Sequence, residues 1–222
     1  MSKTILLNQN WIFSKDGHDE TVTLPHTWNA MDGQDGGNDY YRGTCHYTKI
    51  LPAPELPAGG RAVLQFDGVA MTAVVSLNGE KLAEHKGGYS TFRVDITDAL
   101  RPSNNILTVT VDNSDNDTVY PQKADFTFYG GIYRDVTLHI VPAAHFALAA
   151  NGAVPIKVTP VVTDLAAHRC EVTVEAFVVG AQSVNFTLDG QQTSAAVKDG
   201  TARAVFTLEH ARLWDGLDDP YL

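Results

Sequence analysis

Residues 73–85 read AVVSLNGEKLAEH, and this stretch decides the fold class. A short run rich in aliphatic residues precedes Asn78-Gly79, and a second strand-like run follows it. Asn-Gly between two such runs is a strong hairpin signal, because a type I′ turn requires positive φ at both central residues. The stretch therefore predicts two antiparallel strands joined by a two-residue turn.

Runs of the same kind recur on both sides of this hairpin. They are rich in β-branched residues and alternate with period two, which is typical of half-buried strands. No long segment repeats apolar residues at helical spacing. Many short strands separated by Gly, Asn and Pro turns predict an all-β sandwich architecture. The clearest of these runs are residues 61–66, 91–96, 106–111 and 135–141.

A composition change near Pro142 predicts two domains. Residues 1–142 contain nearly all of the aromatic and glycine-rich loops, and residues 143–222 are plainer strands separated by turns such as Asp189-Gly190. The second part has the rhythm of a small immunoglobulin-like sandwich. Because residues 214–222 stop on an apolar pair just after a turn, we expect this sandwich to lack its final strand or strands.

Composition limits the partners and the compartment. The 222 residues carry a net charge of −10, which argues against nucleic acid and against an anionic membrane surface. No apolar run approaches the roughly 20 residues that span a bilayer, and the apolar start is shorter than a signal-peptide core. Cys45 and Cys170 are isolated, so we expect two buried free thiols. These features together predict a cytoplasmic protein.

Three loops combine aromatic rings, carboxylates or amides, and glycines: residues 24–29, 35–43 and 124–136. Sugar sites need this mixture, because a ring covers the C–H face of a sugar while Asp and Asn bind its hydroxyls. Structural roles are the alternative for each residue. Trp28 could belong to a core or interface, Gly130-Gly131 could supply positive φ at a bulge, and Arg134 could pair with a carboxylate.

A series of short motifs occurs in a fixed order along the chain, and the series resembles the amino-terminal sugar-binding domain of family-2 glycoside hydrolases, the β-galactosidase and β-glucuronidase group. The end of the chain resembles the end region of that family's second, immunoglobulin-like domain. The motifs are residues 24–29, 41–43 with Tyr47, 66–69, 77–79, 85–92, 95–97, 111–113, 130–136 and 212–222.

The resemblance implies a jelly-roll β-sandwich followed by an immunoglobulin-like β-sandwich. It also implies a third, catalytic (β/α)₈ barrel with two glutamates, which this chain does not contain. The chain is then the non-catalytic front of a retaining glycoside hydrolase, with a β-galactosidase as the expected parent and a β-glucuronidase as the alternative. A stand-alone carbohydrate-binding module and a structural interaction domain remain competing interpretations.

The resemblance also indicates site residues. Asp125 matches an aspartate that binds a sugar hydroxyl, with a monovalent cation beside it. Asn38 and Asp39 are the nearest candidates for a second contribution, and Tyr129 completes the substrate-binding set. We expect no required cofactor, with Na⁺ or Mg²⁺ possible in the full-length parent, and a homo-oligomeric full-length protein. Residues 112–117 lack the Gly and Glu of a calcium loop, so calcium is not expected there.

Overall fold

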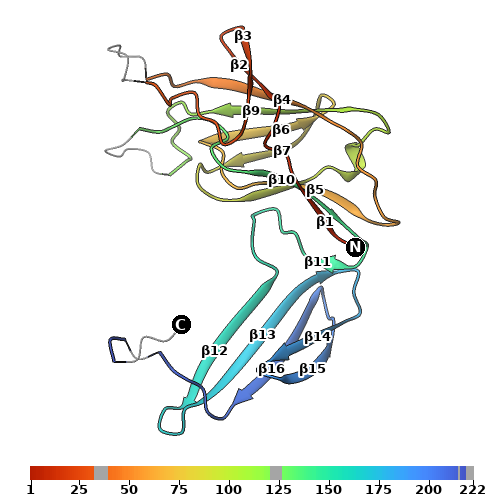
Figure 1. Cartoon of the computed structure of the whole chain (residues 1–222), viewed down its shortest axis with the longest axis vertical. Helices are drawn as coiled ribbons and strands as arrows, with labels where there is room; N and C mark the ends of the chain where they lie inside the picture. The colour runs from red at the N-terminus through yellow and green to blue at the C-terminus, as the bar shows by residue number, and fades with distance from the viewer. Residues whose placement is uncertain (33–39, 121–126, 215, 219–222) are drawn as a thin grey trace. The chain divides into compact units, whose positions relative to one another are not determined.

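The computed structural model describes residues 1–32, 40–120, 127–214 and 216–218. The chain divides into two compact units (Figure 1). Unit 1 comprises Met1–Ala143 and Leu148–Ala153, and unit 2 comprises Ala144–Ala147 and Val154–Leu222. Apart from one 3₁₀ turn, η1 (Thr97–Ala99), the regular elements of the described residues are β-strands. The all-β prediction is confirmed.

Unit 1 is a sandwich of two antiparallel sheets. A six-stranded sheet has the order β3-β2-β4-β9-β6-β7, and a four-stranded sheet has the order β1-β10-β5-β8. The strands are β1 (Lys3–Leu6), β2 (Trp11–Lys15), β3 (His18–Val22), β4 (Thr44–Leu51), β5 (Arg61–Phe66), β6 (Thr72–Leu77), β7 (Glu80–Lys86), β8 (Phe92–Asp95), β9 (Asn105–Asp112) and β10 (Val136–Val141).

The predicted hairpin lies at the edge of the six-stranded sheet. Strands β6 and β7 pair antiparallel with Leu77 opposite Glu80. The two turn residues have φ values of 55° for Asn78 and 87° for Gly79, as a type I′ turn requires.

The core of unit 1 lies between the two sheets. Alternate residues of β9 are buried, as period two predicts, and they pack against buried residues from the opposite sheet. Members from the six-stranded sheet include Trp11, Tyr47 and Leu107, and members from the four-stranded sheet include Leu64 and Leu138. This arrangement is the jelly-roll sandwich that the first part of the sequence predicts.

Unit 2 is the immunoglobulin-like sandwich. Strand β13 (Arg169–Val179) pairs with β11 (His145–Phe146), with β12 (Ile156–Asp164) and with β16 (Thr201–Leu208). Strands β14 (Ser183–Leu188) and β15 (Gln191–Ala196) form a separate two-stranded sheet. The core of this unit is small and includes Val172, Phe186 and Phe206.

Both cysteines are free and buried, as the sequence predicts, with Cys45 in unit 1 and Cys170 in unit 2. Within the described part of the chain, no helix has the length and apolar character needed to cross a membrane.

Candidate functional site

The described part of the candidate site lies in unit 1, between β9 and β10. Of the four sugar-contacting residues that the sequence predicts, Asn38, Asp39 and Asp125 lie outside the described residues. Tyr129 is described and is 48% exposed, although Phe128 before it and Gly130 after it are both buried. The geometry around Tyr129 is therefore the part of the candidate site that the structure defines.

Asn29 joins three separate chain segments through its side-chain amide. Its Oδ1 accepts a hydrogen bond from the Gly130 N–H at 2.7 Å, and its Nδ2 donates to the Tyr41 carbonyl at 2.8 Å and to Asp32 Oδ2. The same Asp32 oxygen accepts from the Tyr41 N–H at 3.0 Å. These bonds connect residues that precede and follow the 33–39 segment in sequence.

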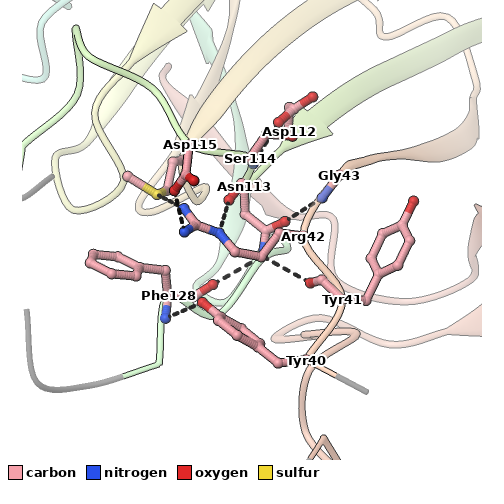
Figure 2. A network of polar contacts seen from close by, with 10 residues as sticks. Tyr40, Tyr41, Arg42, Gly43, Asp112, Asn113, Ser114, Asp115 and Phe128 are labelled. Carbon is pink, nitrogen blue, oxygen red and sulfur yellow. Dashed lines mark hydrogen bonds and ion pairs between the residues drawn. The ribbon is translucent and has the colours of Figure 1, made fainter. Parts of the chain in front are cut away.

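Asn113, immediately after β9, has a similar role (Figure 2). Its Oδ1 accepts from the Gly43 N–H at 2.9 Å, and its Nδ2 donates to the Phe128 carbonyl at 3.0 Å. The same Nδ2 lies 3.2 Å from Asn29 Oδ1, so the two carboxamides bond directly to each other. We call the side chains of Asn29 and Asn113 the amide pair.

Arg42 lies beside Asn113 of the amide pair (Figure 2). Its Nε donates to the Asn113 carbonyl at 2.7 Å, and its Nη1 forms an ion pair with Asp115 at 2.5 Å. The guanidinium carbon lies 5.1 Å from the ring centroid of Phe128 and 5.9 Å from that of Tyr40, which is within cation–π range. Because the Asp115 side chain is 91% exposed, the ion pair itself adds little stability.

Tyr40 contributes a further connection. Its hydroxyl oxygen accepts a hydrogen bond from the Phe128 N–H at 2.6 Å. Burial raises the pKa of the Tyr40 hydroxyl above its usual value, partly offset by the bond from Phe128 and the charge of Arg42. The hydroxyl therefore stays protonated at neutral pH.

Trp28 and the two glycines have structural roles in the described residues. Trp28 is buried and stacks on Phe13 with ring centroids 5.9 Å apart. A Cβ on Gly130 would lie 2.0 Å from Trp28 Cζ2, so this position requires glycine for close approach. Gly131, with φ of 137°, is the residue that needs the positive φ predicted for the pair.

Arg134 ties loops together, but through the backbone. Its Nη1 donates to the carbonyls of Asp67 and Tyr89, each at 3.1 Å. Arg134 therefore bonds carbonyls rather than a carboxylate among the described residues. The neighbouring carboxylate of Asp135 accepts a hydrogen bond from Asn8 Nδ2 at 2.8 Å.

The acidic stretch 112–117 begins at Asp112, the last residue of β9, whose carboxylate is hydrogen-bonded within the protein. Burial alone would raise the pKa of Asp112, but hydrogen bonds from Thr44 and Ser114 hold it below its usual value. In the residues that the structure describes, no group of three or more His, Cys, Asp or Glu side chains could hold a metal ion. The cation predicted beside Asp125 concerns a residue outside the described set.

Sequence reasoning missed the amide pair. Both asparagines lie in motifs quoted for the resemblance, Asn29 at the end of residues 24–29 and Asn113 at the end of 111–113, but neither was predicted to act. For Asn113 alone a local signal was available, since a short polar residue at the end of a strand run is suited to bond loop backbone groups through its amide.

Known proteins resemble this chain over most of its length. The sugar binding domain of glycosyl hydrolases family 2 matches residues 34–142. A β-glucuronidase of Bacteroides fragilis is 32% identical over 98% of this chain and 34% of its own length. A β-galactosidase of Thermoanaerobacter pseudethanolicus is 34% identical over 63% of this chain and 19% of its own length.

A solved structure agrees over the whole chain. The crystal structure of an FMN-binding β-glucuronidase from Facaelibacterium prausnitzii L2-6 has a TM-score of 0.84 and 38% identity, and the match covers 99% of this chain and 36% of that one. The chain therefore belongs to glycoside hydrolase family 2 and contains its amino-terminal sugar-binding domain. It spans about a third of the length of these glucuronidases.

Proposed function

We propose that this chain is the non-catalytic amino-terminal part of a β-glucuronidase that hydrolyses O-glycosidic bonds with retention. The observation that carries this proposal is the similarity to the Bacteroides fragilis β-glucuronidase, which extends over 98% of the chain. The sequence alone favoured a β-galactosidase parent. The β-galactosidase relative has comparable identity but matches 63% of the chain, so a galactosidase is the second candidate.

In this proposal the chain shapes the sugar pocket and supports a catalytic barrel. The barrel supplies the two carboxylates of a retaining hydrolase, about 5–5.5 Å apart. Tyr129 offers a half-exposed ring to the C–H face of the sugar. Asp125, with Asn38 or Asp39, binds hydroxyls, and a monovalent cation is held beside Asp125. No other cofactor is required, and the full-length protein is a cytoplasmic homo-oligomer.

The first test is the intact mass and activity of the native gene product. A product at least roughly twice this chain in mass, with room for a barrel of about 250 residues, is expected. It should hydrolyse p-nitrophenyl β-D-glucuronide with kcat/KM about 100-fold or more above that for the galactoside. The reverse preference selects the β-galactosidase. A native product of 222 residues excludes the enzyme and leaves a carbohydrate-binding module or an interaction domain.

The site assignment has its own test. Replacing both Asp125 and Asn38 by alanine in the native product should lower kcat/KM without lowering Tm. Unchanged kinetics would remove these residues from the site.

A further inference from the structure

The backbone on both sides of Tyr129 is held by hydrogen bonds. On one side, the Phe128 N–H donates to Tyr40 Oη at 2.6 Å and its carbonyl accepts from Asn113 Nδ2 at 3.0 Å. On the other side, the Gly130 N–H donates to Asn29 Oδ1 at 2.7 Å and its carbonyl accepts from Thr27 Oγ1 at 2.7 Å. All four backbone polar groups flanking Tyr129 are therefore bonded to side chains from elsewhere in the fold.

The two side chains of the amide pair are buried, and their hydrogen bonds restrict their orientation. Asn29 is 1% exposed and Asn113 is 0% exposed. Rotating the Asn113 amide by 180° would turn its NH₂ group toward the Gly43 N–H and its oxygen toward the Phe128 carbonyl, so only one orientation satisfies its neighbours. A buried amide with one allowed orientation is a rigid support, because leaving its partners unpaired is costly.

Packing adds to this support. The buried Trp28 ring lies directly against the Gly130 backbone, with no room for even a Cβ. Tyr129 itself remains half exposed. A half-exposed ring on an immobilised backbone is a preorganised contact surface, since little freedom is left to lose when a ligand binds.

We infer that Asn29 and Asn113 are positioning residues that orient Tyr129 toward the sugar. This inference rests on the proposed function, because the role of Tyr129 as a substrate contact belongs to the full-length hydrolase. The amide pair does not touch the sugar. It acts by holding the peptide groups that carry the Tyr129 ring.

The chain offers a matched control at the other end of the same strand. Asn105 begins β9, is 0% exposed and also bonds several backbone groups, accepting from the Arg101 N–H and donating to the Ser103 carbonyl. The eight residues of β9 place it roughly 26 Å from Asn113 at about 3.3 Å per residue. Asn105→Asp and Asn113→Asp thus make the same chemical change in equally buried sites, near and far from Tyr129.

The experiment compares these two variants in the native gene product, with p-nitrophenyl β-D-glucuronide and the galactoside as substrates. Both should lower Tm, because each replaces an NH₂ donor by a carboxyl oxygen that faces carbonyls. Asn113→Asp should lower kcat/KM for the preferred substrate about 10- to 100-fold, and Asn105→Asp less than about 2-fold, as expected for misplacement of a positioned group. Equal losses in the two variants, or unchanged kinetics in Asn113→Asp, would overturn the inference.

A gentler variant covers the case in which Asn113→Asp does not fold. Tyr40→Phe removes only the acceptor of the Phe128 N–H and keeps the ring beside Arg42. It should lower kcat/KM severalfold, with a smaller loss of Tm than Asn113→Asp because it leaves only one N–H unpaired. Tyr133→Phe, which removes a hydroxyl bonded to the Gly88 carbonyl, is its control. Equal effects from the two would also overturn the inference. A wild-type product inactive on both substrates would instead show that the proposed function fails.

Discussion

The two units differ in how completely their apolar faces are covered. In unit 1, two sheets enclose a core in which Leu107 on β9 is 0% exposed. In unit 2, every residue of β12 is exposed, and Val158 on that strand is 56% exposed. Val158 pairs with Val174 of β13 and lines an open apolar groove of about 300 Å³ between β12, β13 and β14.

The difference shows what an alternating pattern means. Strand β12 carries Ile156, Val158, Pro160 and Val162 at alternate positions, as β9 carries Leu107, Val109 and Val111. The pattern marks a face that is able to pack, but burial requires an opposing layer. Unit 1 has that layer along β9. In the described part of unit 2, β13 and β16 contribute buried residues to the core, whereas every residue of β12 is exposed.

The first comparison adds one methyl group in each unit. Gly130→Ala in unit 1 drives a Cβ into the buried Trp28 ring and should cost about 3 kcal/mol, the upper end of the usual range for overpacking. Gly190→Ala in unit 2 meets no atom within 4 Å and pays only for its φ of 75°, about 1–2 kcal/mol. Urea unfolding monitored by tryptophan fluorescence and circular dichroism measures both. Comparable losses of unfolding free energy in the two variants would contradict the difference in packing between the units.

Truncations on β9 and β12 form the second comparison. Leu107→Ala should cost about 2–5 kcal/mol, because it opens a cavity in an enclosed core. Val158→Ala should stay within about 0.5 kcal/mol, as expected for an exposed position. Thermal unfolding of the two variants beside wild type measures this. A large loss in Val158→Ala would mean that β12 is covered in solution.

Some of these features could be predicted from the sequence, and others depend on contacts between distant residues. The Asn78-Gly79 hairpin and the alternation of β9 follow from local rules, because turn chemistry and strand period act within a few residues. The amide pair could not be predicted in this way. Asn29 and Asn113 are 84 residues apart, and their bond depends on the complete sandwich bringing them together.

Individual roles at the candidate site were also beyond local rules. Trp28 had two open interpretations, and only its stacking on Phe13 and contact with Gly130 decide for the core. Tyr129 stays half exposed between two buried residues whose backbones are bonded to Asn113 and Asn29. Long-range packing decides which aromatic residue of a loop stays exposed.

Thiol labelling should sharpen the comparison under native conditions. Cys45 is fully enclosed in unit 1, and burial raises the pKa of its thiol to about 11, so it needs both opening and deprotonation to react. Cys170 lies in the smaller core of unit 2. We expect a disulfide reagent to modify Cys170 about 10-fold faster or more, since labelling follows local opening. Mass spectrometry with Cys45→Ala and Cys170→Ala assigns the rates. Faster labelling of Cys45 would reverse the order of stability.

The smallest effect concerns pH, and it follows from the burial that stabilises unit 1. Burial is the main cause that lowers the pKa values of His26, His85 and His139 below their usual 6.5, and all three lie in this unit. Below pH 6.5 the unfolded chain binds protons that the folded unit excludes. Their stabilising contribution is therefore complete above that pH and is lost as pH falls toward the folded pKa values.

The fluorescence-detected unfolding midpoint of unit 1 should accordingly decrease from pH 7 to pH 5. His85→Phe keeps a ring stacked on Phe92, where the His85 centroid lies 4.2 Å away, and removes one titrating group. Its midpoint should decrease less steeply than that of wild type. A wild-type midpoint that stays constant to pH 5 would mean that these imidazoles are as accessible to protons in the folded unit as in the unfolded chain. The enclosure that distinguishes unit 1 would then be weaker than its packing indicates.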